Sequence, residues 1–261
     1  MEGESKLHAI IPAAGYATRL YPLTLDMPKH LLEVKGKPVI EHVIEKIRET
    51  GTGKIFIVSN EKYYRNFIDW AKNFNSKSKA AGPVVRVLND GTTSNEDRIG
   101  QIGDIIFGIE QARINDDLLI VAGDNLFNFS LKPCLDFFTE KKMPVNALWD
   151  CSSTETAKQL GVVSINGNGK LSAFWEKPGN PKTTLVSLGI YFFPKKSIKL
   201  FKQYIFQKNN PDKMGYFMEW LIKNSEAYGY VYKEKWFDIG WRESLEQARK
   251  EFNPGKQGEI K

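Results

Sequence analysis

Short apolar runs alternate with helical patterns through the first half of this 261-residue chain. The runs are rich in branched residues and bounded by turn residues, which predicts buried strands over 10–11, 55–58, 84–88 and 118–121. Apolar residues at helical spacing predict helices over 39–47, 63–74 and 105–112. Because strand, helix, strand in alternation is typical of a doubly wound sheet, we expect an α/β fold with a Rossmann-like, mostly parallel mixed sheet flanked by helices.

The second half of the chain, after Pro144, is richer in strand patterns. Residues 161–165 and 171–175 predict a β-hairpin, since the Asn/Gly cluster between them supplies the turn conformations. Further elements are expected as strands over 186–193 and 229–232 and as helices over 197–207, 217–224 and 244–252. No linker is long enough to separate independent domains. We therefore expect a single domain, 1–261, in which a smaller β-rich subregion of about 144–252 is built onto the sheet of about 6–143.

Composition and charge exclude several classes of protein. Apolar residues make up 41% of the chain and charged residues 26%, and no window approaches the ~20 apolar residues of a membrane span. Residues 1–5 lack the features of a signal peptide, so we expect a cytoplasmic protein with no membrane partner. Two cysteines and three histidines lack the spacing of a zinc site. The net charge of +6 fits phosphate-bearing partners and equally a solvated face, but no interleaved aromatic and basic motif is present, so we expect no nucleic-acid partner.

The loop after the first predicted strand reads AAGYATRLYPLTLDMPK over 13–29. A loop in this place leaves the carboxyl end of a strand, where α/β proteins bind ligands. Gly15 can take a positive φ and lets phosphate oxygens approach the main chain, while Arg19 and Lys29 supply cations. Taken singly, Gly15 is more often a turn glycine and Arg19 a surface charge. The loop is neither a Walker A sequence nor a GxGxxG fingerprint, because Ala17 stands where the second glycine would be.

Three further motifs place charged residues after predicted strands. Asp124 follows an apolar strand, at the sheet edge where Mg²⁺ can be held beside phosphates, although a lone aspartate here is more often a turn residue or a helix N-cap. Glu176 and Lys177 end another strand, where they can grip a sugar hydroxyl and a phosphate; the alternative is an exposed pair before a turn. Asp238 stands in WFDIG over 236–240, and a plain turn aspartate before glycine is also common.

Together these motifs resemble the signature of the sugar-1-phosphate nucleotidyltransferases. The family's usual form runs roughly AGGxGTRLxPLT followed by PKPLLPV, and this chain reads AAGYATRLYPLT followed by PKHLL. GDNLF over 123–127 resembles the glucose-1-phosphate thymidylyltransferases more than most relatives, and EKP at 176–178 and W-x-D-x-G at 236–240 also match. The motifs occur in the family order across nearly the whole chain. The resemblance implies a nucleotide-diphospho-sugar transferase-like fold, with local geometry that differs at Ala17 and His30.

The resemblance also implies roles for individual residues. Those that match the family's site positions are Arg19, Lys29 and Asp124 as catalytic residues, Ala13, Ala14, Gly15, Gln101 and Gly103 as nucleotide-binding residues, Gly161, Glu176, Lys177 and Gly189 as sugar-phosphate-binding residues, and Asp124 and Asp238 as ligands of a Mg²⁺ cofactor. Within this set, Arg19 would bind the leaving pyrophosphate, Lys29 the α-phosphate and Lys177 the attacking phosphate.

The segment 89–104, where the family reads the base, gives the weakest match. Gly103 stands before a predicted helix, as in the family's base-side segment. Either Arg98 or Gln101 can supply a hydrogen bond to the base edge. A polar loop capped by Asp104 is an equal alternative for these side chains.

The implied reaction joins a nucleoside triphosphate to a sugar 1-phosphate and releases pyrophosphate. The GDNLF segment favours dTTP and glucose 1-phosphate, while UTP or CTP and other phosphorylated alcohols stay open. A catalytically silent regulatory subunit that binds nucleotide sugars is the alternative, but the residues for metal and pyrophosphate are all present. A nicotinamide oxidoreductase is disfavoured by the absent GxGxxG. The sequence leaves the oligomeric state open, including a homo-oligomer.

Overall fold

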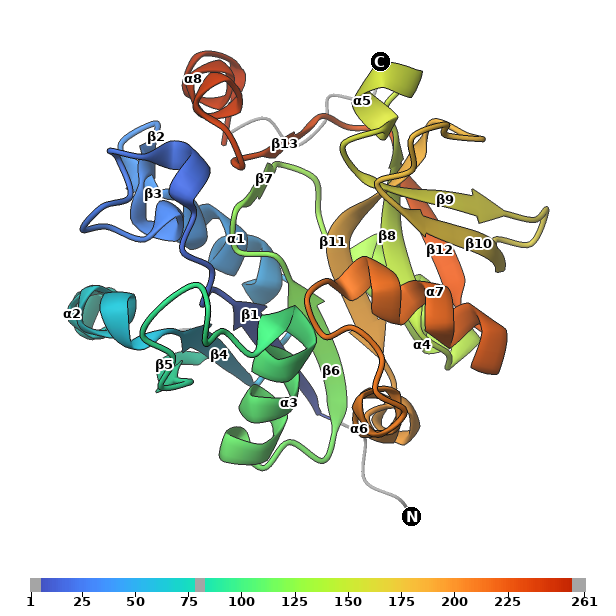
Figure 1. Ribbon diagram of the computed structural model, residues 1–261, viewed down its shortest axis with the longest axis horizontal. Coiled ribbons are helices and arrows are strands. Elements are labelled where there is room, and N and C mark those ends of the chain that lie inside the picture. The colour runs from blue at the N-terminus through green and yellow to red at the C-terminus, as the bar shows by residue number, and fades with distance from the viewer. Residues whose placement is uncertain (1–5, 78–82, 255–261) are drawn as a thin grey trace.

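Strand β1 (Leu7–Pro12) lies inside a nine-stranded mixed sheet (Figure 1). In this computed structural model, which describes residues 6–77 and 83–254, β1 pairs in parallel with β4 (Lys54–Ser59) and β6 (Asp117–Val121), and β4 pairs in parallel with β5 (Val84–Asn89). The sequence predicts these four strands, and the structure confirms them. Because parallel strands end at the same edge of a sheet, the segments that follow β1 and β6 meet there.

Strand β11 (Leu185–Phe193) joins the second half of the chain to this sheet by running antiparallel to β6. The predicted hairpin is present as β9 (Gly161–Ile165) and β10 (Leu171–Glu176), and Gly169 in its turn has a φ of +80°. Strand β8 (Val145–Asp150) runs antiparallel to β11 and parallel to β12 (Tyr228–Tyr232). One mixed sheet therefore runs through both halves of the chain, which confirms the doubly wound α/β prediction.

Helices cover the sheet on both faces. Successive side chains of a strand point to opposite faces, so Ile11 belongs to one core cluster and Ile10 to the other. The first cluster includes residues of α1 (Val39–Arg48), α2 (Glu61–Lys77) and α4 (Lys132–Lys141). The second includes residues of α3 (Gly100–Ala112), α6 (Lys199–Phe206) and α7 (Met214–Asn224). None of the helices that the structure describes is long and apolar enough to cross a membrane.

The structure contains several elements that the sequence did not predict, and one predicted helix begins at a different residue. Helix α4 buries only Cys134 and Phe138, too few apolar positions for helical periodicity to show. Helix α3 begins earlier than predicted, at Gly100, because glycines in its first turn weaken the helical signal. Strand β8 was not predicted either, and the other missed elements are short: β2 (Glu33–Val34), β3 (Lys37–Pro38), β7 (Asn125–Phe127), α5 (Thr154–Ala157) and β13 (Trp236–Asp238).

Strand β13 and helix α8 (Arg242–Glu251), together called the C-terminal unit, fold back onto the first half of the chain. Strand β13 pairs antiparallel with β7 in a register that sets Asp238 opposite Asn125. Helix α8 buries Leu245 in a separate core cluster that also contains Val34. In Figure 1, α8 and β13 accordingly lie beside β2 and β7. The motif that contains Asp238 is thus brought to the sheet edge where β1 and β6 end.

Candidate active site

A cleft of about 920 Å³ lies at the edge of the sheet where β1 and β6 end. Its walls come from the loop after β1, the segment after β6, the end of β10 and the C-terminal unit. The predicted site residues that line it are Ala14, Gly15, Arg19, Lys29, Gln101, Asp124, Lys177 and Asp238. The predicted residues outside its lining are Ala13, Gly103, Gly161, Glu176 and Gly189. Four separate sequence motifs therefore contribute to one cavity.

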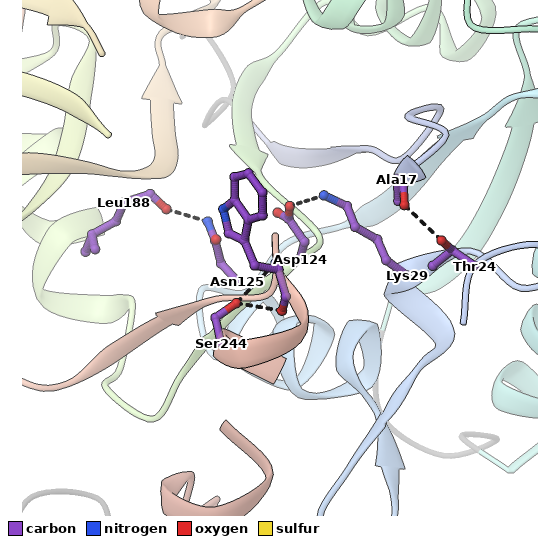
Figure 2. Close-up of polar contacts among 8 residues, drawn as sticks. Ala17, Thr24, Lys29, Asp124, Asn125, Leu188 and Ser244 are labelled. Carbon is purple, nitrogen blue, oxygen red and sulfur yellow. Dashed lines mark hydrogen bonds and ion pairs between the residues drawn. The ribbon is translucent and has the colours of Figure 1, made fainter. Parts of the chain in front are cut away.

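Side-chain hydrogen bonds hold the backbone of the loop after β1. The Asn60 amide donates to the carbonyl of Ala14 at 2.7 Å, and the Tyr63 hydroxyl donates to the carbonyl of Thr24 at 2.6 Å. The Thr24 hydroxyl donates to the carbonyl of Ala17 at 2.8 Å (Figure 2). Asn60 and Tyr63 belong to the junction of β4 and α2, so the packed sheet itself fixes the path of the loop.

The positive φ expected at Gly15 falls on Ala17 instead. Ala17 has φ and ψ of 48° and 40°, in the left-handed region that glycine adopts without strain. A Cβ added to Gly15 would meet nothing within 4 Å, so the residue leaves space for a ligand in the cleft. Ala13 is buried, and its N–H extends the pairing of β1 with β4 by donating to Val58 at 2.8 Å. The loop therefore makes its left-handed turn with an alanine where the family pattern has a glycine.

Replacing Ala17 with glycine is expected to raise the free energy of unfolding by about 1 kcal/mol, because a left-handed conformation costs an L-residue about that much more than glycine. Urea unfolding followed by circular dichroism measures the change. Lys142, exposed at the end of α4 with a φ of +52°, provides a matched control remote from the cleft, and Lys142→Gly should give a similar gain. A loss of stability confined to Ala17→Gly would contradict strain at this position.

Lys29 and Asp124 form an ion pair inside the cleft (Figure 2). Their side chains are 18% and 19% exposed. Burial alone would lower the pKa of Lys29, but the carboxylates of Asp124 and Asp238 outweigh it and raise this pKa. Burial likewise opposes ionisation of Asp124, but the Lys29 ammonium outweighs it and lowers the pKa of Asp124. Both groups are therefore charged at neutral pH.

Asp238 adds a second carboxylate to this pair. Burial raises the pKa of Asp238 to about 6, and repulsion from Asp124 adds to the rise, while the cations Lys29, Lys177 and Arg19 oppose it. The surrounding cations therefore offset only part of the negative charge of these two carboxylates. No group of three or more metal-ligating side chains occurs in the described parts of the chain. Two carboxylates fit Mg²⁺, which takes one or two from a protein and completes its shell with water and substrate phosphates.

Two hydrogen bonds to backbone carbonyls set the positions of these carboxylates. The Asn125 side chain donates to the carbonyl of Leu188 at 2.6 Å (Figure 2), which ties the segment after β6 to β11. The N–H of Ile239 donates to the carbonyl of Asp124 at 2.9 Å. Because Ile239 directly follows Asp238, this bond and the pairing of β13 with β7 bring the two aspartates together.

Gly123 and His30 pack against each other behind the ion pair. A Cβ on Gly123 would lie 2.6 Å from Cγ2 of Ile11 and 2.9 Å from Cδ2 of His30, so a side chain there would push this segment off β1. His30, which replaces the family's usual proline, is 2% exposed and packs 5.8 Å from the ring of Phe67. Burial and the adjacent ammonium of Lys29 lower the pKa of His30 to about 3. The imidazole is therefore a neutral packing group.

Lys177 enters the cleft from the end of β10. Its backbone lies in the left-handed region, with a φ of +49°, and its N–H donates to the carbonyl of Leu160 at 3.1 Å. Leu160 also lines the cleft. A lysine in this region is strained, and such strain is typical of functional positions that the surrounding structure holds in place.

The neighbouring Glu176 does not line the cleft. Its carboxylate is 9% exposed, pairs with Lys213 at 3.3 Å, and lies against the first turn of α7, where a Cβ on Gly215 would collide with it. A Cβ on Gly161 would lie 2.8 Å from the Phe174 ring and 3.6 Å from Oε2 of Glu176. The structure therefore places Glu176 beside Gly161, under α7.

Gly189, the fourth residue assigned to the sugar side, lies on β11 beside the segment after β6. It has a φ of +69°, and a Cβ there would lie 2.9 Å from Nδ2 of Asn125 and 3.0 Å from Cβ of Ala122. Its carbonyl accepts a hydrogen bond from the N–H of Ala122 at 2.8 Å. Gly189 thus lets β11 approach the backbone that carries Asp124.

The structure brings Gly100 to the cleft and leaves Gly103 outside its lining. Gly103 sits within α3, where a Cβ would meet Cβ of Ile99 at 2.9 Å. Gly100 has a φ of +78°, and a Cβ there would lie 2.6 Å from the carbonyl oxygen of Pro211. The sequence signal, a glycine at the start of a helix, applies to both positions and could not distinguish them.

Arg98 and Gln101 both contact the loop that precedes α7. The Arg98 guanidinium pairs with Asp212 at 2.9 Å and donates to the side chain of Asn95 at 2.7 Å. The Gln101 side-chain oxygen accepts from the N–H of Met214 at 2.9 Å. Both residues line the cleft, so the choice between them as base-reading residues stays open.

Asp104, which the sequence analysis treats only as a loop cap, is a buried acid of the cleft. It is 7% exposed and belongs to the cleft lining. Burial raises the pKa of Asp104 to about 8, and the charge of Asp90 and a hydrogen bond to it add to the rise. Each of these carboxyl groups has one buried oxygen without a donor when both are ionised. A proton on Asp104 supplies the missing hydrogen bond, so Asp104 is protonated at neutral pH.

The raised pKa of Asp104 makes its contribution to stability present at low pH and lost as the pH rises from 3.8 toward about 8. We expect Asp104→Asn, whose amide donates to Asp90 at every pH, to lose stability less steeply over this window. The slopes should differ by up to ~1.4 kcal/mol per pH unit, measured from the free energy of unfolding in urea between pH 5 and 7.5. Asp136→Asn, exposed on α4, should follow the wild type. Parallel profiles for Asp104→Asn and wild type would contradict a protonated Asp104.

Aromatic residues form much of the remaining cleft wall. Those that line it are Tyr16, Trp149, Trp236, Phe237 and Trp241. The rings of Trp149 and Trp236 lie 6.2 Å apart, and Trp241 lies 4.5 Å from the guanidinium carbon of Arg19. None of these five aromatic residues was predicted as a site residue, although Trp236 and Phe237 lie within the W-x-D-x-G motif. The one signal for Trp241 was its position directly after the W-x-D-x-G motif.

Comparison with known proteins matches nearly the whole chain to one family. The model of a family described as nucleotidyl transferase matches residues 8–253. The bifunctional protein GlmU of Methanocaldococcus jannaschii is 27% identical over 94% of this chain, and the chain spans only 54% of that protein. The UTP–glucose-1-phosphate uridylyltransferase AglF of Haloferax volcanii is 25% identical over 93% of this chain and 95% of its own length.

Solved structures share the fold. A provisionally assigned glucose-1-phosphate thymidylyltransferase of Bacillus anthracis, in complex with sucrose, superposes with a TM-score of 0.77 at 24% identity, covering 96% of this chain and 98% of that one. A UDP-glucose pyrophosphorylase complexed with UDP-glucose gives a TM-score of 0.78 at 20% identity, covering 94% and 97% of the two chains. At these identities the likeness establishes the fold, which confirms the expected fold class.

Proposed function

This chain belongs to the nucleotidyl transferase family, and from that premise we propose that it joins a nucleoside triphosphate to a sugar 1-phosphate, releasing pyrophosphate. The observation that carries the proposal is the convergence of four motifs on one cleft, where Arg19, Lys29 and Lys177 surround the carboxylates of Asp124 and Asp238. Cations bind phosphate groups and one or two carboxylates suit Mg²⁺, so this set of charges fits a site for a triphosphate with a divalent ion. The GDNLF segment favours dTTP and glucose 1-phosphate as the substrates.

In the proposed reaction, an oxygen of the sugar phosphate attacks the α-phosphorus in line. The new P–O bond forms as the bond between the α-phosphorus and the β-bridging oxygen breaks, and the electron pair leaves with pyrophosphate. Lys177 binds the attacking phosphate, Lys29 the α-phosphate and Arg19 the departing pyrophosphate. Such a displacement needs positioning and charge neutralisation rather than a covalent enzyme intermediate.

Asp124 and Asp238 would hold Mg²⁺ in this reaction. When bound, Mg²⁺ offsets negative charge on the phosphate oxygens. The Lys29 ammonium keeps Asp124 ionised, and Asp124 is therefore ready to ligate a cation at neutral pH. The residues present thus fit the cofactor that the resemblance implies.

The sugar side of the proposal assigns a sugar hydroxyl to Glu176 and main-chain contacts to Gly161 and Gly189. The proximity of Glu176 to Gly161 supports this grouping. Since the carboxylate now pairs with Lys213, a sugar hydroxyl bound by Glu176 would share or replace that contact. Binding of the sugar phosphate would therefore include a local change at the first turn of α7.

A matrix of nucleoside triphosphates against sugar 1-phosphates tests the proposed function. Purified protein is incubated with Mg²⁺ and each of dTTP, UTP, CTP, ATP and GTP, paired with phosphates of glucose, mannose and N-acetylglucosamine, and pyrophosphate release is measured. We expect turnover with one preferred pair and its loss with EDTA. If no pair turned over while nucleotide sugars bound in calorimetry, the catalytically silent regulatory subunit would be the better description.

A further inference from the structure

Trp241 and Arg19 stack inside the cleft although they come from opposite ends of the sequence. The guanidinium carbon lies 4.5 Å from the centroid of the indole ring, and both residues line the cavity. Arg19 lies in the 3-10 helix Thr18–Leu20 of the loop after β1, and Trp241 caps the first turn of α8. The contact therefore joins the C-terminal unit to the loop expected to bind the triphosphate.

The backbone of Trp241 is held by the start of α8. The N–H of Trp241 donates to Oγ of Ser244 at 3.2 Å, and this hydroxyl donates back to the Trp241 carbonyl at 2.9 Å, in the contact drawn at Ser244 in Figure 2. The N–H of Leu245 also donates to that carbonyl, at 3.0 Å, and the Leu245 side chain is fully buried. Trp241 itself is 45% exposed. The backbone of Trp241 is thus anchored, while its ring is open to the cleft instead of being packed in a core.

Arg19 shows the complementary arrangement. Hydrogen bonds pin the backbone of its loop at Ala14, Ala17 and Thr24. Within residues 6–77 and 83–254, no hydrogen bond or ion pair reaches the Arg19 guanidinium, and the Trp241 ring is the partner that orients it. Stacking uses the face of the guanidinium and leaves its in-plane N–H donors free. These are the donors that bind phosphate oxygens in bidentate fashion.

We propose that Trp241 is a positioning residue that holds Arg19 ready for the β- and γ-phosphates of the triphosphate, and equally for pyrophosphate. The inference deepens the proposed function and rests on it for the identity of the ligand. An Arg19 side chain without the indole must lose its rotational freedom when phosphate binds, whereas a stacked one has already lost it. Ordering one long side chain costs about 1 kcal/mol, so holding Arg19 in place in advance should strengthen phosphate binding about five-fold at 25 °C.

A double-mutant cycle on pyrophosphate binding tests this role. Calorimetry on the full chain with magnesium pyrophosphate compares wild type, Trp241→Ala, Arg19→Ala and the double variant. We expect Trp241→Ala to weaken binding about five-fold, and to have no further effect in the Arg19→Ala background. Trp241→Phe keeps an aromatic face and should recover most of the affinity. Phe206→Ala removes an aromatic residue that is 88% exposed on α6, outside the cleft lining, and should bind as wild type.

Kinetics give a second readout that a structural role would not produce. With Arg19 misplaced but present, the KM for the triphosphate should rise about five-fold in Trp241→Ala, while kcat changes less than two-fold. A Trp241→Ala effect of equal size in the Arg19→Ala background would overturn the proposal, because the indole would then contact the ligand itself. Unchanged or tighter pyrophosphate binding would overturn it too, since Arg19 would not need the stack. The binding cycle requires no turnover, so failure of the proposed reaction in wild type is a separate result.

Discussion

Lys29→Ala is expected to lower kcat by at least ~100-fold, the effect of removing one electrostatic stabiliser from a transition state. The ammonium is proposed to bind the α-phosphate, and in the structure it pairs with Asp124. Its loss also removes the cation that lowers the pKa of Asp124 and opposes the raised pKa of Asp238. The measurement is pyrophosphate release at saturating concentrations of the preferred substrate pair.

The control for Lys29→Ala is a lysine that also pairs with an aspartate but is exposed, as is its partner. Lys72 lies 3.8 Å from Asp69 on α2, where the two side chains are 74% and 76% exposed. Lys72→Ala should leave kcat unchanged. Turnover within a few-fold of wild type in a folded Lys29→Ala protein would reject the role assigned to Lys29.

Asp124→Asn is expected to lower kcat by at least ~100-fold as well, for a different reason. The change removes one of the two carboxylates proposed for Mg²⁺ and leaves the partly buried Lys29 ammonium without its partner. The Mg²⁺ concentration for half-maximal rate should rise, because the amide is a weaker ligand than the carboxylate. Pyrophosphate release over a Mg²⁺ titration measures both effects.

Asp69→Asn, in the exposed pair on α2, provides the matched control for Asp124→Asn and should behave as wild type. The double variant Lys29→Ala with Asp124→Asn should lose less than the product of the two single losses, since residues that act as a unit are not additive. If Asp124→Asn kept both its kcat and its Mg²⁺ dependence, this carboxylate would have no part in the reaction.

A general rule about sheets makes it possible to predict from the sequence which charged residues meet. Arg19, Lys29 and Asp124 follow strands that run in parallel, and the ends of parallel strands share one edge. Lys177 and Asp238 join them through turns whose position the motifs indicate. The fold then determines how far each of these side chains is buried and which charges surround it. The structure places all five residues in the cleft lining. The common location of residues that follow parallel strands could be predicted because topology decides it, while the roles of all five residues stay predictions.

The details it missed depend on backbone conformation and on packing between distant segments. The left-handed turn lies at Ala17 instead of Gly15, in a loop whose backbone is held by the side chains of Thr24, Asn60 and Tyr63, and no local pattern reveals these contacts. The contact of Glu176 with Lys213 depends on how α7 docks on the sheet. The stack of Trp241 on Arg19 likewise needs the register of β13 against β7 before it can be inferred.

The docking of the C-terminal unit leads us to expect that this unit can detach before the rest of the fold opens. Among the strands of residues 6–77 and 83–254, β13 pairs only with the three-residue β7, and helix α8 rests on a small core cluster separate from the two that cover the main sheet. Detachment of the unit would withdraw Asp238 and Trp241 together while the nine-stranded sheet stayed folded. Segments with few buried contacts open at free energies below that of global unfolding. Heat or mild denaturant should therefore abolish activity before the sheet melts, with the opening equilibrium of β13 and α8 setting the active fraction.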